Sequence, residues 1–115
     1  MFNEKYAHGK KFNVNADKFE FIELKDLIEN VKKGHCTVKV LGVFTYEAKY
    51  GVRPVIIIAE GYKVNLPDHC LGDVQSIMKD QEDIDAINAG HCGFKTSEYT
   101  DGKGVKRYSG SFIDI

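Results

Sequence analysis

The amino-acid sequence predicts a mainly β (α+β) domain of five strands with helices added to them. Residues 37–66 contain three strand-like runs joined by two tight turns, and Val and Ile fill their apolar positions, which favours a pleated sheet. Two more strand-like runs lie on either side of the glycine-rich turn at residues 101–104. Between these two groups, residues 68–90 carry apolar side chains at helical spacing.

Length and composition indicate an ordinary globular domain. The chain has 115 residues, of which 43% are hydrophobic and 29% charged, and its formal net charge is −1, so bulk charge indicates no polyanionic partner. We expect residues 1–17 to form a flexible arm and residues 18–115 to form one domain. With three cysteines, no apolar run of membrane-spanning length and no signal-peptide core, we expect a reducing, cytoplasmic location.

A helix is expected ahead of the five strands. Phe19 and Phe21 alternate in the manner of a short strand. The apolar residues after them recur at helical spacing, and they are Leu24, Leu27, Ile28 and Val31. Gly34 is suited to end such a helix. The pattern therefore predicts an extra amphipathic N-terminal helix that packs its apolar stripe on the sheet.

The first of the five strands is expected to be long and bent. It covers residues 36–47, and the alternation of its apolar side chains slips at Leu41 and Gly42. A phase slip at a glycine indicates a β-bulge, where a strand coils sharply. A strand bent in this way can serve two edges of a small barrel.

The second and third strands form a meander with the first. Pro54 lacks an N–H donor, so we expect it at a strand start or edge. Residues 55–59 are apolar on both faces, which predicts a central second strand. Residues 60 and 61, Glu and Gly, make a compact turn into the third strand at residues 62–66.

The segment at residues 68–90 is expected to form two short helices. Asp68 is a candidate N-cap for the first helix and Asp80 for the second, because carboxylates accept hydrogen bonds from free backbone N–H groups. Gly90 is suited to close the second helix. The apolar stripes consist of Leu71, Val74, Ile77, Met78, Ile84 and Ile87.

The order of these elements resembles the oligonucleotide/oligosaccharide-binding (OB) fold. Three strands in a meander, a helical insertion and two final strands, from Phe94 and over residues 105–113, match its five-stranded Greek-key barrel. The resemblance covers residues 36–115. The segments KYG and VNLP and the closing strand also resemble small phage and mobile-element proteins thought to bind single strands. This second resemblance implies a role in phage or mobile-element DNA metabolism.

The resemblance implies where a ligand would bind. In OB folds the ligand lies across strands two and three, between the loops after strands one and four. Here those loops cover residues 46–53 and 99–108, and both mix Tyr with Lys or Arg. Tyrosine rings stack on bases and Lys or Arg neutralise phosphates. We therefore predict binding of single-stranded DNA, with RNA left open, by Tyr46, Lys49, Tyr50, Arg53, Tyr62, Lys63, Tyr99, Lys103, Lys106, Arg107 and Tyr108.

The sequence contains no motif of an enzyme. Three adjacent His-Cys pairs occur, at residues 35–36, 69–70 and 91–92. Neighbouring residues on a strand point to opposite faces, and no CxxC or HxxxH spacing is present, so zinc binding is not indicated. There is no phosphate-binding glycine loop and no nucleophile motif. We expect a non-enzymatic protein without metal or cofactor.

An acidic segment supports an alternative function. Residues 68–87 contain six carboxylates and one lysine, and a block of like charge can bind a basic protein. The alternative is a protein-interaction module, such as a mobile-element-encoded inhibitor of a host protein. The oligomeric state is not indicated by the sequence.

Overall fold

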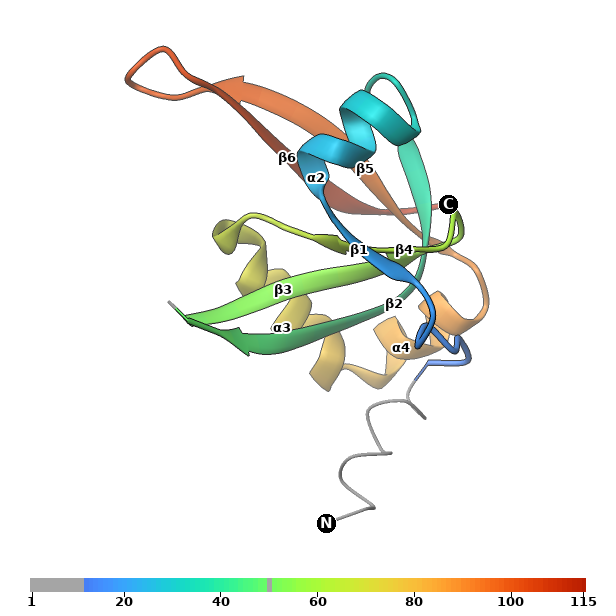
Figure 1. The fold of residues 1–115 in the computed structure, drawn as a ribbon. Helices are drawn as coiled ribbons and strands as arrows, with labels where there is room; N and C mark the ends of the chain where they lie inside the picture. The colour runs from blue at the N-terminus through green and yellow to red at the C-terminus, as the bar shows by residue number, and fades with distance from the viewer. Residues whose placement is uncertain (1–11, 50) are drawn as a thin grey trace.

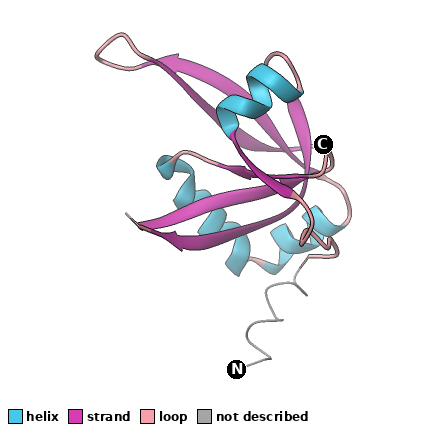
Figure 2. Cartoon of the chain, viewed as in Figure 1, coloured by secondary structure: helices cyan, strands magenta, loops and turns pink. Residues whose placement is uncertain are grey.

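The fold is a single curled sheet covered by short helices. The structure is a computed structural model that describes residues 12–49 and 51–115. The strands form one sheet in the order β1-β4-β3-β2-β5-β6, curled into a half-barrel (Figures 1 and 2). In chain order the elements are β1 (Glu20–Glu23), α2 (Leu24–Asp26), the π-helical turn η1 (Leu27–Val31), β2 (Thr37–Ala48), β3 (Gly51–Ile58), β4 (Tyr62–Asn65), the 3₁₀ turn η2 (Asp68–Cys70), α3 (Leu71–Lys79), α4 (Gln81–Asn88), β5 (Cys92–Thr100) and β6 (Lys106–Asp114).

Strand β2 joins the two halves of the sheet. Its first residues pair with β5, and the part from Val40 onwards pairs with β3. The register with β3 shifts between Val40 and Gly42, which confirms the predicted bulge. A Cβ atom at Gly42 would lie 3.1 Å from the ring of Phe12 and 3.2 Å from the Cδ1 atom of Ile57. Glycine at the bulge therefore leaves room for Phe12 to pack on the sheet.

The prediction of five strands is wrong, because the sheet has six. The additional strand is β1, in which Phe21 is exposed and Ile22 packs against the core. It pairs parallel with β4, with Phe21 opposite Lys63. Since β1 occupies that edge of β4, β6 ends the sheet without pairing with β4. The predicted N-terminal helix is present, but it is a single α-turn that continues as a π-helical turn up to Val31.

The proline of β3 lies where that strand has one neighbour. Pro54 is the fourth residue of β3, whereas pairing between β3 and β4 begins at Val55. The carbonyl of Pro54 accepts the last cross-strand hydrogen bond, from the N–H of Leu66, at 3.0 Å. The missing N–H of proline therefore removes no bond from the ladder, and the expected edge position is confirmed.

The predicted helices at residues 68–90 are confirmed as η2, α3 and α4. Asp80 caps α4, because its side chain accepts hydrogen bonds from the backbone N–H groups of Glu82 and Asp83. Asp68 does not cap α3, which begins at Leu71 without a side-chain cap. Its carboxylate lies instead 3.4 Å from Arg53, so an ion pair takes the place of the predicted cap.

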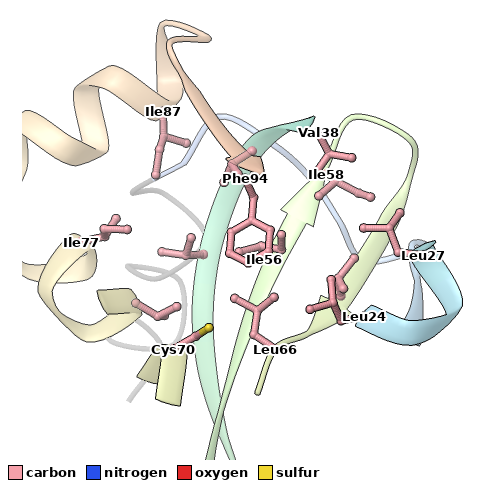
Figure 3. Packing of buried hydrophobic residues seen from close by; sticks show 14 of the residues in the cluster. Leu24, Leu27, Val38, Ile56, Ile58, Leu66, Cys70, Ile77, Ile87 and Phe94 are labelled. Atoms are coloured by element: carbon pink, nitrogen blue, oxygen red, sulfur yellow. The ribbon is translucent and has the colours of Figure 1, made fainter. Parts of the chain in front are cut away.

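The core lies on the concave face of the sheet. Figure 3 shows Phe94 and Ile56 at its centre, between the side chains of α3 and α4 and those of α2 and η1. Residues 1–11 of the predicted arm lie outside the described residues, and Phe12 is 6% exposed. No helix among the described residues is long and apolar enough to cross a membrane.

Gly110 of β6 is required by close packing. A Cβ atom there would overlap the ring of Phe94 and approach the carbonyl oxygen of Lys95 to 2.6 Å. We expect Gly110→Ala to lower the free energy of unfolding by about 1–3 kcal/mol, because overpacking displaces the core. Urea unfolding measures this change. Gly102→Ala is the matched control, because no atom lies within 4 Å of its added Cβ, and an equal loss in both variants would contradict the assignment.

Candidate nucleic-acid interface

A cleft of about 800 Å³ lies at the seam where the sheet does not close. Side chains from β3, β4, η2, β5, β6 and the start of α2 line it. The cleft brings together residues from both predicted ligand loops. They are Arg53, Tyr99, Lys106, Arg107 and Tyr108.

An aromatic patch on the outer face of the sheet borders this cleft. The rings of Phe21 and Tyr46 meet edge to face with their centroids 5.8 Å apart, and Phe44 lies 6.2 Å from Phe21. The ammonium group of Lys63 lies 4.5 Å from the centre of the Phe21 ring. Cross-strand pairing explains the arrangement, because Phe21 and Lys63 occupy opposite positions of β1 and β4.

Hydrogen bonds connect the patch to the cleft. The hydroxyl of Tyr46 donates to Asn65 at 3.0 Å, and the amide of Asn65 donates to Glu23 at 2.7 Å. Asn65 and Glu23 both line the cleft, as does Tyr99. Among the described Phe and Tyr side chains, the exposed ones are Phe21 (49%), Tyr46 (37%) and Tyr99 (48%). All three therefore lie along one surface that runs from β1 into the cleft.

Three cations of the cleft, all from the predicted ligand loops, are paired with carboxylates. Arg53 lies 3.4 Å from Asp68, the Nζ atom of Lys106 lies 2.9 Å from Glu98, and Arg107 lies 3.0 Å from Asp101. Such exposed ion pairs contribute little to stability. An incoming phosphate can therefore replace a carboxylate at small cost, although the carboxylates reduce the positive field of the cleft.

Tyr108 and Tyr62 are less available than predicted. Tyr108 packs against the core, and its hydroxyl donates a hydrogen bond of 2.7 Å to Glu29. This bond raises the pKa of Tyr108. Tyr62 is half-buried and also packs against the core. Both rings therefore support the surface from beneath more than they present a face to a ligand.

Two further predicted residues, Lys49 and Lys103, lie at turns. Lys49 is exposed at the turn between β2 and β3. Lys103 is exposed at the tip of the β5–β6 hairpin, where its backbone N–H donates to Asp101. Tyr50 lies outside the described residues. The structure thus brings five of the predicted residues into the cleft and two, Tyr46 and Lys63, onto the adjacent patch.

Two residues of this surface were missed by the sequence reasoning. Phe21 was assigned only to the alternation ahead of a helix, and its place in the sheet depends on pairing with β4. His69 contacts the ring of Tyr99 at a centroid distance of 6.3 Å, and its Nε2 atom lies 2.6 Å from the hydroxyl of Ser109. The acidic residues around it in the sequence gave no signal of this position.

Two of the three cysteines, Cys70 and Cys92, are not set up for nucleophilic chemistry. Burial raises the pKa of Cys70 and of Cys92 to about 11, and neighbouring carboxylates add to the shift. Both thiols are therefore protonated at neutral pH and are poor nucleophiles. Within residues 12–49 and 51–115, no three His, Cys, Asp or Glu side chains are grouped so that they could hold a metal ion.

Comparisons with known proteins do not assign this surface. No protein-family model, curated protein or solved structure matches the chain.

Asp101 organises the hairpin that carries Arg107. Its carboxylate accepts hydrogen bonds from the backbone N–H groups of Val105 and Lys103 and from the guanidinium of Arg107. These bonds lower the pKa of Asp101, and the bond from Val105 has the largest effect. The ionised carboxylate therefore stabilises the folded hairpin.

The pH dependence of this contribution is testable with Asp101→Ala. A carboxyl group whose pKa is lowered by folding stabilises the folded state fully at pH values above its ordinary pKa of about 4. This stabilisation is lost as the pH falls through the lower pKa of the folded state. We expect wild type to exceed the variant in stability at neutral pH, and the difference to shrink below about pH 4. Urea unfolding from pH 7 to pH 3 measures the difference, and a pH-independent one would contradict the role of the charge.

Proposed function

We propose that this protein binds single-stranded nucleic acid, DNA in the first place, without sequence preference and without catalysis. The observation that carries the proposal is the placement of the exposed rings of Phe21, Tyr46 and Tyr99 along one surface. Bases present flat faces that stack on such rings with little regard to sequence. Lys63, Arg53, Lys106 and Arg107 lie beside the rings and can neutralise phosphates.

The order of elements supports an OB-like reading of the sheet. The meander β2-β3-β4, the helices α3 and α4 and the hairpin β5-β6 occur in the order of an OB fold, and β5 pairs with β2. The sheet departs from a closed barrel at one place, because β1 lies beside β4. In this proposal the face of the meander binds the strand, and the seam beside β1 accommodates one of its ends.

The paired carboxylates set the expected affinity. Three of the proposed phosphate-binding cations are already in ion pairs, so each phosphate contact replaces one attraction with another. Stacking then provides most of the binding free energy, and affinity depends less on salt than in strongly basic proteins. The protein-interaction alternative uses residues 68–87, which lie mainly on η2, α3 and α4.

The stacking role is tested with Phe21→Ala and Tyr99→Ala. Each should weaken binding of a labelled oligo-dT strand by roughly 1–3 kcal/mol, with little change in salt dependence, because a stacking face is lost. Fluorescence anisotropy at several salt concentrations measures both quantities. Val105→Ala is the control, since Val105 is 48% exposed near the same hairpin but has no ring. Absence of binding to any single strand at low salt would disprove the proposed function.

The phosphate role is tested with Lys63→Ala. Its loss should reduce the slope of log affinity against log salt by about one, because one phosphate contact disappears. Lys95→Ala is the control, because Lys95 is exposed on β5 and does not line the cleft. An equal decrease in slope for both lysines would show that only the overall charge matters. A parallel titration with oligo-U tests whether RNA binds as well.

A further inference from the structure

In the part of the chain that the structure describes, one edge of strand β6 has no neighbouring strand. Two hydrogen bonds show which residues of β6 bond to β5 and which point to the free edge. The N–H of Ile115 donates to the carbonyl of His91 at 2.9 Å, whereas the N–H of Thr96 donates away from β6, to Cys36 of the chain before β2, at 2.8 Å. In an antiparallel pair, bonded and non-bonded positions alternate.

This alternation identifies the free backbone groups of β6. Thr96 is opposite Gly110, so Gly110 occupies a non-bonded position relative to β5. Continuing the alternation, the N–H and C=O groups of Gly110, Phe112 and Asp114 point to the free edge. Those of Ser111 and Ile113 point to β5. The C-terminal half of β6 therefore offers a regular row of donors and acceptors to an added strand.

A cavity of about 450 Å³ lies beside this half of β6. Residues 111–114 line it together with α3, α4 and Cys92. Its apolar lining includes Ile77, Ile87 and Phe112, and three carboxylates surround these side chains, namely Asp73, Asp83 and Asp114. The cavity is thus apolar and negatively charged, and it adjoins unpaired backbone.

Among the residues that the structure describes, these three carboxylates have no positive partner, since none of them forms an ion pair. Asp83 and Asp114 both add to the raised pKa of Cys92, and all three residues line the cavity. A cationic side chain entering beside them would gain charge complementarity that residues 12–49 and 51–115 do not provide.

We propose that the edge of β6 at residues 110–114 binds an extended, basic segment of a partner protein as an added strand. Backbone groups of the segment pair with Gly110, Phe112 and Asp114, an apolar side chain contacts Phe112, and a Lys or Arg lies among the carboxylates. A second copy of this chain is a poorer fit. Residues 110–114 contain no Lys or Arg, so pairing them with the same edge of a second copy would bring a second Asp114 among the carboxylates.

This partner site is distinct from the proposed nucleic-acid surface. The cleft contacts Lys106, Arg107 and Tyr108 of β6, whereas the cavity contacts residues 111–114. The two sites therefore occupy different halves of one strand, and binding at one can be measured while the other is disabled.

The experiment uses a labelled short peptide of the pattern Lys-Thr-Val-Thr-Lys, in which Lys and Val lie two residues apart and therefore point to the same face of the added strand. Fluorescence anisotropy should show binding, whereas a peptide with Asp in place of Lys should bind at least about tenfold more weakly because its charge is wrong. The first peptide methylated on alternate backbone nitrogens should also bind at least about tenfold more weakly, because it cannot pair with the edge. Equal binding by all three peptides, or no binding, would overturn the proposal.

Variants test the cavity itself. Asp83→Asn and Asp114→Asn should each weaken peptide binding about threefold to tenfold, whereas Glu82→Gln, next to Asp83 but outside the cavity, should leave it unchanged. Amide hydrogen exchange tests which backbone N–H groups of β6 point to the free edge. The amides of Phe112 and Asp114 should become protected when the peptide binds, whereas that of Ile113 is protected already. Protection that does not alternate in this way would show that the peptide does not pair with β6 as an added strand, and would overturn the proposal. A dimer that forms without peptide in sedimentation and buries these amides would show that a second copy of the chain binds the edge, and would also overturn it.

Discussion

The bend of β2 at Gly42 determines where the other elements of the fold lie. One strand pairs with β5 before the bend and with β3 after it, so the two halves of the sheet cannot separate without breaking β2. The bend curls the sheet around Phe94 and Ile56, and the helices then cover the concave face (Figure 3). The outer face of the meander is left with the aromatic patch, and the seam is left with the cleft. Both candidate surfaces are therefore consequences of one bulge.

Local patterns predicted most of this fold because the responsible forces are local. Alternating Val and Ile, the glycine at the bulge and the turn at residues 101–104 each act within a few residues, and each is observed where it was expected. The alternation of Phe19 and Phe21 indicates a short strand, but the place of β1 in the sheet was not predicted, because β1 pairs with a strand about forty positions away. No periodicity within Glu20–Glu23 can reveal a partner that distant.

The contacts of the candidate site were likewise predictable where they are local in sequence and unpredictable where they are distant. Both loops were expected to carry rings and cations, and five of those residues do line one cleft. The pairing of Arg107 with Asp101 is local and could have been read from the turn. The pairing of Arg53 with Asp68 was hidden, since it depends on β4 returning the chain to the start of β3. The sequence therefore predicted that residues of the two loops lie together, but it did not predict the ion pairs that reduce their free positive charge.

The parallel pairing of β1 with β4 also has a consequence for the order of folding. The meander and the β5–β6 hairpin close short loops, whereas β1 meets β4 only after the chain between them has ordered. Loop closure over such a separation is entropically costly, so contacts of this kind form late. An edge strand of four residues is also the first part of a sheet to open in the native state. We infer that β1 acts as a removable strap, and that its release would uncover the edge of β4 and enlarge the seam at the cost of the contacts that Ile22 makes with the core.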